Sequence, residues 1–484
     1  MPEPRSTPQR QPDTRRRPRQ KAAGFAILAA VYLAVVYLIP RPAAVKPEGW
    51  RLTGIFIAVI VGSALQPIPG GALVLIAITL SSIWGGLSIS QALAGYADAT
   101  VWLVMAAFFI SRALINTGLA RRIALFFVRL FGQSSLRVCY ALALSDAILA
   151  TVIPSNGARS GGVILPIARS IAELYQSYPG PTAGLIGSFL MTAVYQGICI
   201  SAAMFFTGQA SNPLAAQMAA PFGVHVTWAS WFFAGIAPGL CSLIVVPWIV
   251  LRLNRPQIEQ TPEAAAFARR EMQAMGPMKS SEKILSVVFA SVCALWVTSG
   301  WHGIDITVIA LGGSVALLVM GVLDWEDVKG EKAAWEIFIW YGGLLRLGRA
   351  LHEAGVTTAF ANLVASTFSG AGWAALFVIA LLIYFYAHYA FASITAHMLA
   401  MYPAFLAALL SQGAPGGLVV YAFACFTNLA AGLTNYGTTP SPMYFAQGYV
   451  SMKTWWRVGL VASVVNIAIW STVGFAWWKA LKIW

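Results

Sequence analysis

The 484-residue sequence has little charge. Asp, Glu, Lys and Arg make up only 10% of it, whereas 58% of its residues are hydrophobic. A soluble domain of this length has too little interior to bury so much apolar surface, so the scarcity of charge excludes a soluble globular protein. Apolar runs long enough to cross ~30 Å of hydrocarbon recur between Gly24 and Trp478. We predict an all-α polytopic membrane protein with about eleven transmembrane helices.

Paired cysteines and the short motifs of several enzyme classes are also missing. The five cysteines stand singly in apolar segments, at Cys139, Cys199, Cys241, Cys293 and Cys425. This spacing suits neither a metal site nor a redox site. No HExxH and no GxxxxGK(S/T) occurs, so zinc hydrolysis and ATP-driven pumping lack their usual signatures. We therefore predict no metal, no cofactor and no catalytic residue.

Acidic residues are fewer than basic ones, which gives a formal net charge of +14. In a soluble protein this excess would suggest nucleic acid as a partner, but here the basic residues gather in short segments between apolar runs. Residues 1–22 hold seven Lys or Arg against two acids. The positive-inside rule places this tail in the cytoplasm, together with segments 117–137 and 252–283. We predict a multi-pass protein of the bacterial inner membrane with the lipid bilayer as its surroundings, and a cleaved signal peptide is the alternative for its start.

The chain repeats its plan in two halves. We predict a first transmembrane repeat over 23–251, a cytoplasmic loop over 252–283 and a second repeat over 284–484. Each repeat contains a re-entrant helical hairpin with a polar tip, at 138–172 and at 387–410, where apolar arms are too short to span. A further span at 371–386 is expected before the second hairpin. Each hairpin is followed by a helix that a polar, Pro-containing cluster interrupts, a pattern typical of inverted-repeat transporters that bind substrate near the midplane.

The hairpin tips and helix breaks carry the candidate binding residues. Polar groups at membrane depth are costly and usually mark a substrate path. Half-helix N-termini, free amides and hydroxyls favour an anion, and glycine allows close backbone approach or a positive φ. The predicted substrate-binding residues are Ser155, Asn156, Gly157, Arg159, Asn212, Pro213, Ser393, Thr395, His397, Asn435, Gly437, Thr438, Thr439 and Pro440.

Arg159 and His397 are the candidates for positive charge at the site. A buried guanidinium cannot lose its charge, so Arg159 needs an anionic ligand or a fixed partner. The fixed-partner alternative is Asp146, the acid within the arms of the first hairpin. For His397 the alternative is a neutral core histidine bonded to a carbonyl. Each Ser or Thr could instead bond back to a carbonyl one turn earlier.

Four motifs together resemble one known family. They are residues 154–162 (PSNGARSGG), 210–213 (ASNP), 388–397 (HYAFASITAH) and 434–442 (TNYGTTPSP). On these motifs the sequence resembles the divalent anion:sodium symporter family, most closely the branch with citrate/succinate antiporters, tartrate/succinate antiporters and plastid 2-oxoglutarate/malate translocators. The resemblance covers nearly the whole chain after residue 50. It implies di- or tricarboxylate transport, a homodimer, eleven spans and an elevator-like movement of the substrate domain.

Two residues depart from the family pattern. Members carry a Ser-Asn-Thr triplet at each tip, and the resemblance implies that it binds substrate carboxylate and helps to frame a sodium site. Gly157 replaces the first threonine and Ile394 the second asparagine. With Arg159 and His397 as fixed cations in place of Na⁺, we predict carboxylate/carboxylate antiport, because swapping two dianions costs no electrical work.

Three other functions remain open at this point. Sodium-coupled dicarboxylate symport, with Na⁺ as the coupling ion, is the nearest alternative. A membrane-embedded enzyme could use His388 or His397 as a base, with Asp305 or Glu353 nearby in sequence. A passive anion channel is the third. The duplicated architecture favours a transporter over an enzyme.

Overall fold

The computed structural model describes residues 18–367 and 372–484, and the regular elements within these ranges are helices. In lipid, each backbone polar group needs a partner within its own segment, which a helix provides. Eight of the described helices are long and apolar enough to cross a membrane, and three shorter apolar helices lie among them. The predicted all-α polytopic fold is confirmed.

The first half begins with a series of helices that precede the first hairpin. The helices before the first hairpin are α1 (Pro18–Leu33), α2 (Pro47–Leu65), α3 (Gly70–Ile83), α4 (Ile89–Leu93), α5 (Ala99–Thr117) and α6 (Leu119–Phe131). Local sequence sets the ends of α5: the Asp98 side chain accepts a hydrogen bond from the Thr100 amide at 2.8 Å, and Gly118 closes the helix at a φ of +82°.

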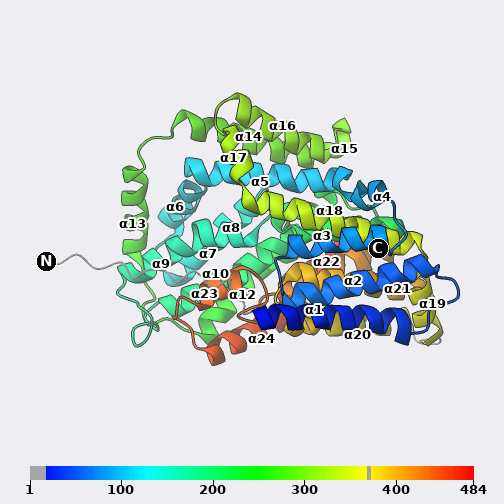
Figure 1. Cartoon of the computed structure of the whole chain (residues 1–484). Coiled ribbons are helices and arrows are strands. Elements are labelled where there is room, and N and C mark those ends of the chain that lie inside the picture. Colours follow the sequence, from blue (N-terminus) through cyan, green and yellow to red (C-terminus); the bar gives the residue numbers. More distant parts are fainter. Residues whose placement is uncertain (1–17, 368–371) are drawn as a thin grey trace.

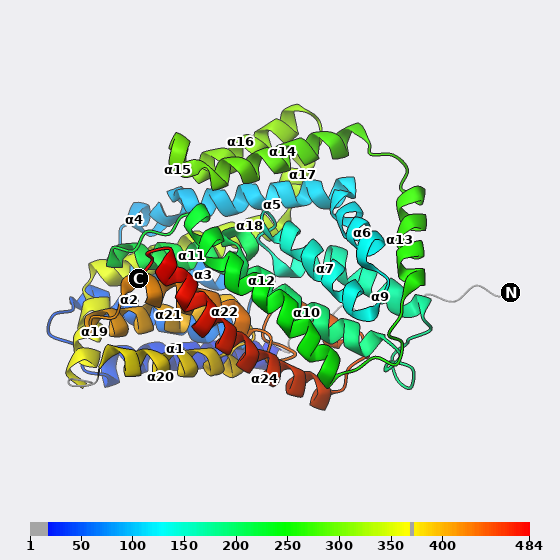
Figure 2. The same ribbon diagram turned by 180° about the vertical axis from the view of Figure 1, so that it is seen from behind.

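The first hairpin and the first interrupted helix follow. Helix α7 (Ser135–Ala150) leads to a non-helical tip, and α8 (Asn156–Arg159) and α9 (Leu165–Leu174), joined by a π-helical turn, lead back. Helix α10 (Gly187–Met204) breaks before α11 (Ser211–Ala219), and α12 (Trp228–Leu253) closes this half. Figure 2 shows α10 and α12 packed side by side, with α24 (Met452–Ile469) against α12.

A charged connection joins the halves. Helix α13 (Pro262–Ala274) packs on α6, and both run across the direction of the neighbouring helices at one end of the molecule (Figure 1). Salt bridges hold this end together: Arg121 lies 2.6 Å from Glu271 of α13, and Arg122 lies 2.7 Å from Glu282. The amphipathic α6 buries Leu125 and Val128 against the core.

The second half repeats this order. Its helices are α14 (Ser280–Val297), α15 (Ser299–His302), α16 (Ile306–Val319), α17 (Trp325–Gly330), α18 (Lys332–Glu353), α19 (Val356–Thr367), α20 (Trp373–Ala387), α21 (Ile394–Ser411), α22 (Gly416–Ala430), α23 (Pro440–Phe445), α24 and α25 (Phe475–Ala480). Helices α5, α14, α16 and α18 lie together in a layer on one side of the hairpins (Figure 1).

The second hairpin differs from its predicted bounds. Helix α20, expected as a separate span, is the first arm, and α21 is the second, with residues 388–393 between them. The predicted range 387–410 covers only the tip and the second arm. Both arms are apolar and long enough to cross a membrane by composition, so hydropathy alone could not identify α20 as part of a hairpin.

Candidate functional site

A cavity of about 430 Å³ lies where the hairpin tips and the helix breaks meet. The tip and break residues on its wall are Pro154, Ser155, Asn156, Gln209, Ala210, Ser393, Ile394, Thr395, Ala396, Thr438 and Thr439. The opposite wall comes from α2, α3 and α18 and includes Ser63, Gln66, Gly70, Glu336 and Trp340. Two regions about half a chain apart thus face one space, which is large enough for a small organic acid.

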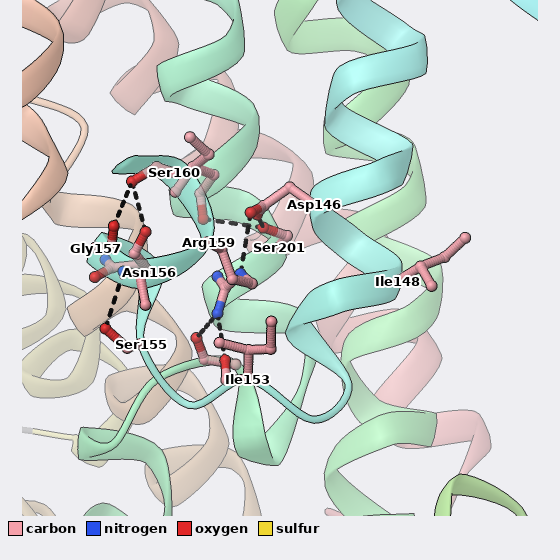
Figure 3. Close-up of polar contacts among 12 residues, drawn as sticks. Asp146, Ile148, Ile153, Ser155, Asn156, Gly157, Arg159, Ser160 and Ser201 are labelled. Carbon is pink, nitrogen blue, oxygen red and sulfur yellow. Dashed lines mark hydrogen bonds and ion pairs between the residues drawn. The ribbon is translucent and has the colours of Figure 1, made fainter. Parts of the chain in front are cut away.

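The two hairpin tips have the same local geometry. Ser155 caps α8 by accepting a hydrogen bond from the Ala158 amide at 3.1 Å, and Ser393 caps α21 by accepting one from the Ala396 amide at 3.3 Å. Each serine oxygen is used as an acceptor, so each hydroxyl proton remains able to donate to a ligand. Ser155 stands at the start of α8 in Figure 3. The matched caps place one hydroxyl donor from each half in the cavity.

Asn156 connects the first tip to the second break. Its Nδ2 donates to the hydroxyl of Thr438 at 3.1 Å, and both side chains are buried. Ser160, also drawn in Figure 3, donates to the Asn156 carbonyl at 2.6 Å and so bonds back within its own helix. Of the tip hydroxyls, Ser160 therefore follows the local alternative, whereas Ser155 faces the cavity.

Gly157 and Gly437 serve close packing. Neither has a positive φ. A Cβ on Gly157 would lie 2.8 Å from Cγ2 of Thr439, and a Cβ on Gly437 would lie 2.9 Å from Nε2 of His388. Of the two roles expected for these glycines, the structure shows close approach between the tips and the break.

Arg159 does not face the cavity. Its side chain is fully buried, its Nε lies 3.0 Å from Oδ1 of Asp146, and its Nη1 donates to the carbonyls of Ile153 and Gly208, both at 2.7 Å (Figure 3). Ser201 donates to the other oxygen of Asp146. The expectation that Arg159 gives its charge to a substrate is corrected, because Asp146, the fixed partner considered as the alternative, pairs with this guanidinium within the protein. Of its three nitrogens, Nη2 alone has no hydrogen-bond partner among the described residues.

His397 also lies behind the cavity wall. Its Nδ1 is 3.1 Å from Nδ1 of His388, whose Nε2 donates to the carbonyl of Gly437 at 2.9 Å, and both rings are buried. The His397 ring packs on Tyr384, with a centroid separation of 4.4 Å. The expectation that His397 supplies a fixed charge to the substrate is therefore corrected too. The two imidazoles instead join the second hairpin to the second break.

Four other predicted residues organise the breaks instead of lining the cavity. Asn212 Nδ2 donates to the carbonyls of Ala202 and Phe205, at 2.8 and 2.9 Å, at the end of α10, where carbonyls lose their helical partners. Pro213 lies in the first turn of α11 and Pro440 begins α23, where a missing amide proton costs little. Asn435 accepts a bond from Trp456 at 3.4 Å.

Glu336 is a cavity residue that the motif analysis missed, together with Gln209, Gln66 and Ser63. It stands near the start of α18, in a segment expected to span. An acid in such a segment is itself a signal for a functional site, and it could have been singled out on that ground.

The residues proposed for a membrane enzyme lie elsewhere. Asp305 caps α16 by accepting from the Thr307 amide at 2.7 Å, and Glu353 pairs with Arg346 at 2.8 Å. Neither lines the cavity. In the part of the chain that the structure describes, no group of three or more His, Cys, Asp or Glu side chains could hold a metal ion.

Comparison with known proteins gives a family match and close relatives. Residues 20–484 match the model of the sodium:sulfate symporter transmembrane region. The chain is 42% identical to the putative malate transporter YflS of Bacillus subtilis, over 96% of this chain and 97% of that one. It is 38% identical to dicarboxylate transporter 1, chloroplastic, of Spinacia oleracea, over 96% of this chain and 83% of that one.

Two solved structures share the fold. Neisseria gonorrhoeae MtrF, from a class of antimetabolite efflux pumps, superimposes with a TM-score of 0.56 at 15% identity and covers 93% of this chain and 97% of its own. The Alcanivorax borkumensis YdaH transporter gives 0.50 at 13% identity, covering 95% and 97%. These two likenesses show the fold alone. The family match and the transporters among the relatives confirm an integral, multi-pass membrane protein that is a transporter and not an enzyme. The chain belongs to the divalent anion:sodium symporter family.

Proposed function

We propose that this protein carries dicarboxylate anions across the bacterial inner membrane by exchanging one for another. The observation that carries the proposal is the cavity between the two hairpin tips, where Ser155 and Ser393 present matched hydroxyl donors. Asn156, Thr395 and Thr439 add further polar groups on the same wall. Hydroxyl and amide donors at helix starts suit carboxylate oxygens. The names of the relatives, malate and dicarboxylate transporters, point to the same substrates.

Exchange is favoured over uptake of a dianion alone by its electrical cost. Importing one negative charge against a negative-inside potential costs about 2.3 kcal/mol per 100 mV, whereas swapping two dianions costs nothing. Gly157 and Ile394 stand where the resemblance implies Thr and Asn, so each tip has one polar side chain fewer with which to frame a sodium site. Arg159 and His397 no longer support exchange, because neither faces the cavity.

Sodium-coupled symport is the second candidate, and the charge of the cavity favours it. The described residues on the cavity wall include no Lys or Arg, and they include one carboxylate, Glu336. A dianion bound there would lack a fixed countercharge. A cation bound with the substrate would supply one.

We further propose an elevator-like movement in a homodimer, with the N-terminal tail in the cytoplasm. The hairpins and breaks are bonded to one another through Asn156–Thr438 and His388–Gly437, and Asn428 donates to Asn212 at 2.8 Å. These contacts support one substrate-carrying unit, which faces α2, α3 and α18 across the cavity.

The test is uptake of labelled succinate into proteoliposomes, loaded or not with unlabelled dicarboxylate, in external Na⁺ or choline. Exchange predicts uptake that needs internal dicarboxylate and is indifferent to Na⁺. Uptake into empty vesicles that follows a Na⁺ gradient would replace exchange by symport. Flux that neither saturates nor responds to internal substrate would indicate a channel.

A further inference from the structure

Glu336 is the one ionisable side chain among the described residues that line the cavity. It projects from the first turns of α18, on the wall opposite the hairpin tips, and its residue is exposed. It takes part in no ion pair among the described residues. No described basic side chain neutralises the negative charge of Glu336, so this charge acts on a ligand in the cavity.

A hydrogen bond fixes where this charge sits. The amide of Gly71, in the first turn of α3, donates to Oε1 of Glu336 at 3.0 Å. The N-terminal end of a helix also complements a negative charge. Since α3 and α18 both belong to the wall facing the tips, the carboxylate is held in place instead of being one of many mobile surface acids.

The remaining groups on the wall do not offset this charge. The polar side chains that the tips and breaks contribute to the cavity wall are hydroxyls and amides, and no described lining residue is a Lys, Arg or His. Arg159 is neutralised by Asp146 behind the wall. A ligand therefore meets donors for its carboxylates on one side and one fixed negative charge on the other.

We propose that Glu336 selects substrates by their charge: it allows dicarboxylates and disfavours substrates that carry a third carboxylate. Two carboxylates of a small acid can reach the donors of the two tips. A third has no further cation to meet and is repelled by Glu336. At the separations within such a cavity and an intermediate dielectric, one extra charge should weaken binding roughly five- to tenfold. This inference rests on the proposed carboxylate transport.

The decisive variant is Glu336→Gln, because glutamine removes the charge but keeps an oxygen that can accept from Gly71. The probes are succinate and tricarballylate, which carries a third carboxylate without adding a hydroxyl group. Each is measured as a competitor of labelled succinate exchange. The ratio of the tricarballylate to the succinate inhibition constant should fall by roughly five- to tenfold in Glu336→Gln. Glu326→Gln on α17 makes the same charge change at a largely exposed residue outside the cavity and should leave the ratio at its wild-type value.

A binding measurement covers the case in which the variant no longer moves substrate. Protection against thermal unfolding in detergent is recorded for both acids, and tricarballylate should protect Glu336→Gln at lower concentration than it protects wild type. The inference is overturned if the ratio is equal in wild type and Glu336→Gln, or if both acids compete equally well in wild type. If wild type transports no dicarboxylate at all, it is the proposed function that fails.

Discussion

Arg159 holds together three parts of the first half. It joins α7 through Asp146, the hairpin tip through the Ile153 carbonyl, and the first break through the Gly208 carbonyl. The Arg159 side chain, which carries the charge, is 0% exposed. Removing one member of such a pair leaves the other buried and uncompensated, which is strongly destabilising.

We predict that Arg159→Leu lowers the free energy of unfolding by about 3–5 kcal/mol. Asp146→Leu should have a similar effect, and the double variant should be less destabilised than the sum of the two, because no charge is then left unpaired. Denaturant unfolding in detergent, followed by tryptophan fluorescence, measures all three. Additive losses would mean that the pair is not energetically coupled. A well-folded Arg159→Leu that has lost only substrate affinity would return this residue to the binding site.

Gly157 gives a second prediction at this scale, because an added methyl would overlap Cγ2 of Thr439. Gly157→Ala should raise the KM for dicarboxylate exchange at least about fivefold, because overpacking displaces the first tip from the second break. Thr439→Ser removes Cγ2 and keeps the hydroxyl. The double variant Gly157→Ala/Thr439→Ser should recover most of the loss, whereas Thr439→Ser alone stays near wild type. Failure of the serine change to rescue would contradict a steric cause.

The sequence could predict which tip hydroxyls face the cavity but not where the side chains of Arg159 and His397 lie. Ser155, Ser393 and Thr438 lie on the cavity wall. Their positions could be predicted because helix caps and breaks are local features, which Ser, Pro and Gly mark within apolar runs. The positions of Arg159 and His397 depend on partners brought in by the fold. His397 contacts His388 across the segment 388–393, which no hydrophobic periodicity predicts. That Ser155, Ser393 and Thr438 bind substrate remains a prediction.

At the scale of elements, the breaks depend on side chains that replace lost helical bonds. Asn212 satisfies two carbonyls at the end of α10 and accepts from Asn428, and all of these groups are buried. The broken helices of the two halves are thereby joined directly.

We predict that Asn212→Ala costs about 1–3 kcal/mol of stability, because buried polar groups lose their partners. Asn435→Ala is the matched control at the other break. It removes one bond of 3.4 Å to Trp456 and should cost less than about 0.5 kcal/mol. Thermal unfolding in detergent compares the two. Equal losses would show that Asn212 has no special part in the break.

The elements also show what hydropathy can and cannot decide. The first hairpin has two short arms around a polar tip, so its range of 138–172 could be written from sequence, close to the 135–174 of α7 to α9. Helix α20 carries no polar residue before Tyr384, so its sequence is typical of a transmembrane span. Whether an apolar helix crosses or turns back depends on its neighbours, α21 and α22, which composition does not reveal.

At the scale of the whole molecule, a hydrogen bond between Gln217 and Arg349 is among the contacts that cross the proposed boundary between the substrate-carrying unit and its surroundings. Arg349 of α18 donates to Gln217 of α11 at 2.9 Å and, on the other side, lies 2.5 Å from Asp98 before α5. The first contact joins the two units, and the second stays within one.

We predict that a flexible bifunctional thiol reagent stops exchange in Gln217→Cys/Arg349→Cys but not in Asp98→Cys/Arg349→Cys, both without the native cysteines. Cleaving a reducible linker should restore transport in the first variant. Because both variants share the change at Arg349, the loss of that side chain is controlled. Full exchange with the 217–349 link in place would exclude movement at this boundary.

The Gly157–Thr439 contact limits which pairs of residues can stand at positions 157 and 439 in related sequences. Two residues that lie far apart in the chain share one volume, since a side chain at 157 would occupy the space of the Thr439 methyl. A sequence with a threonine at 157 must have a smaller or displaced residue at 439, and the reverse also holds. We therefore expect these positions to vary together among relatives, so that the residue at one tip indicates substrate class only when it is read with its partner in the opposite half.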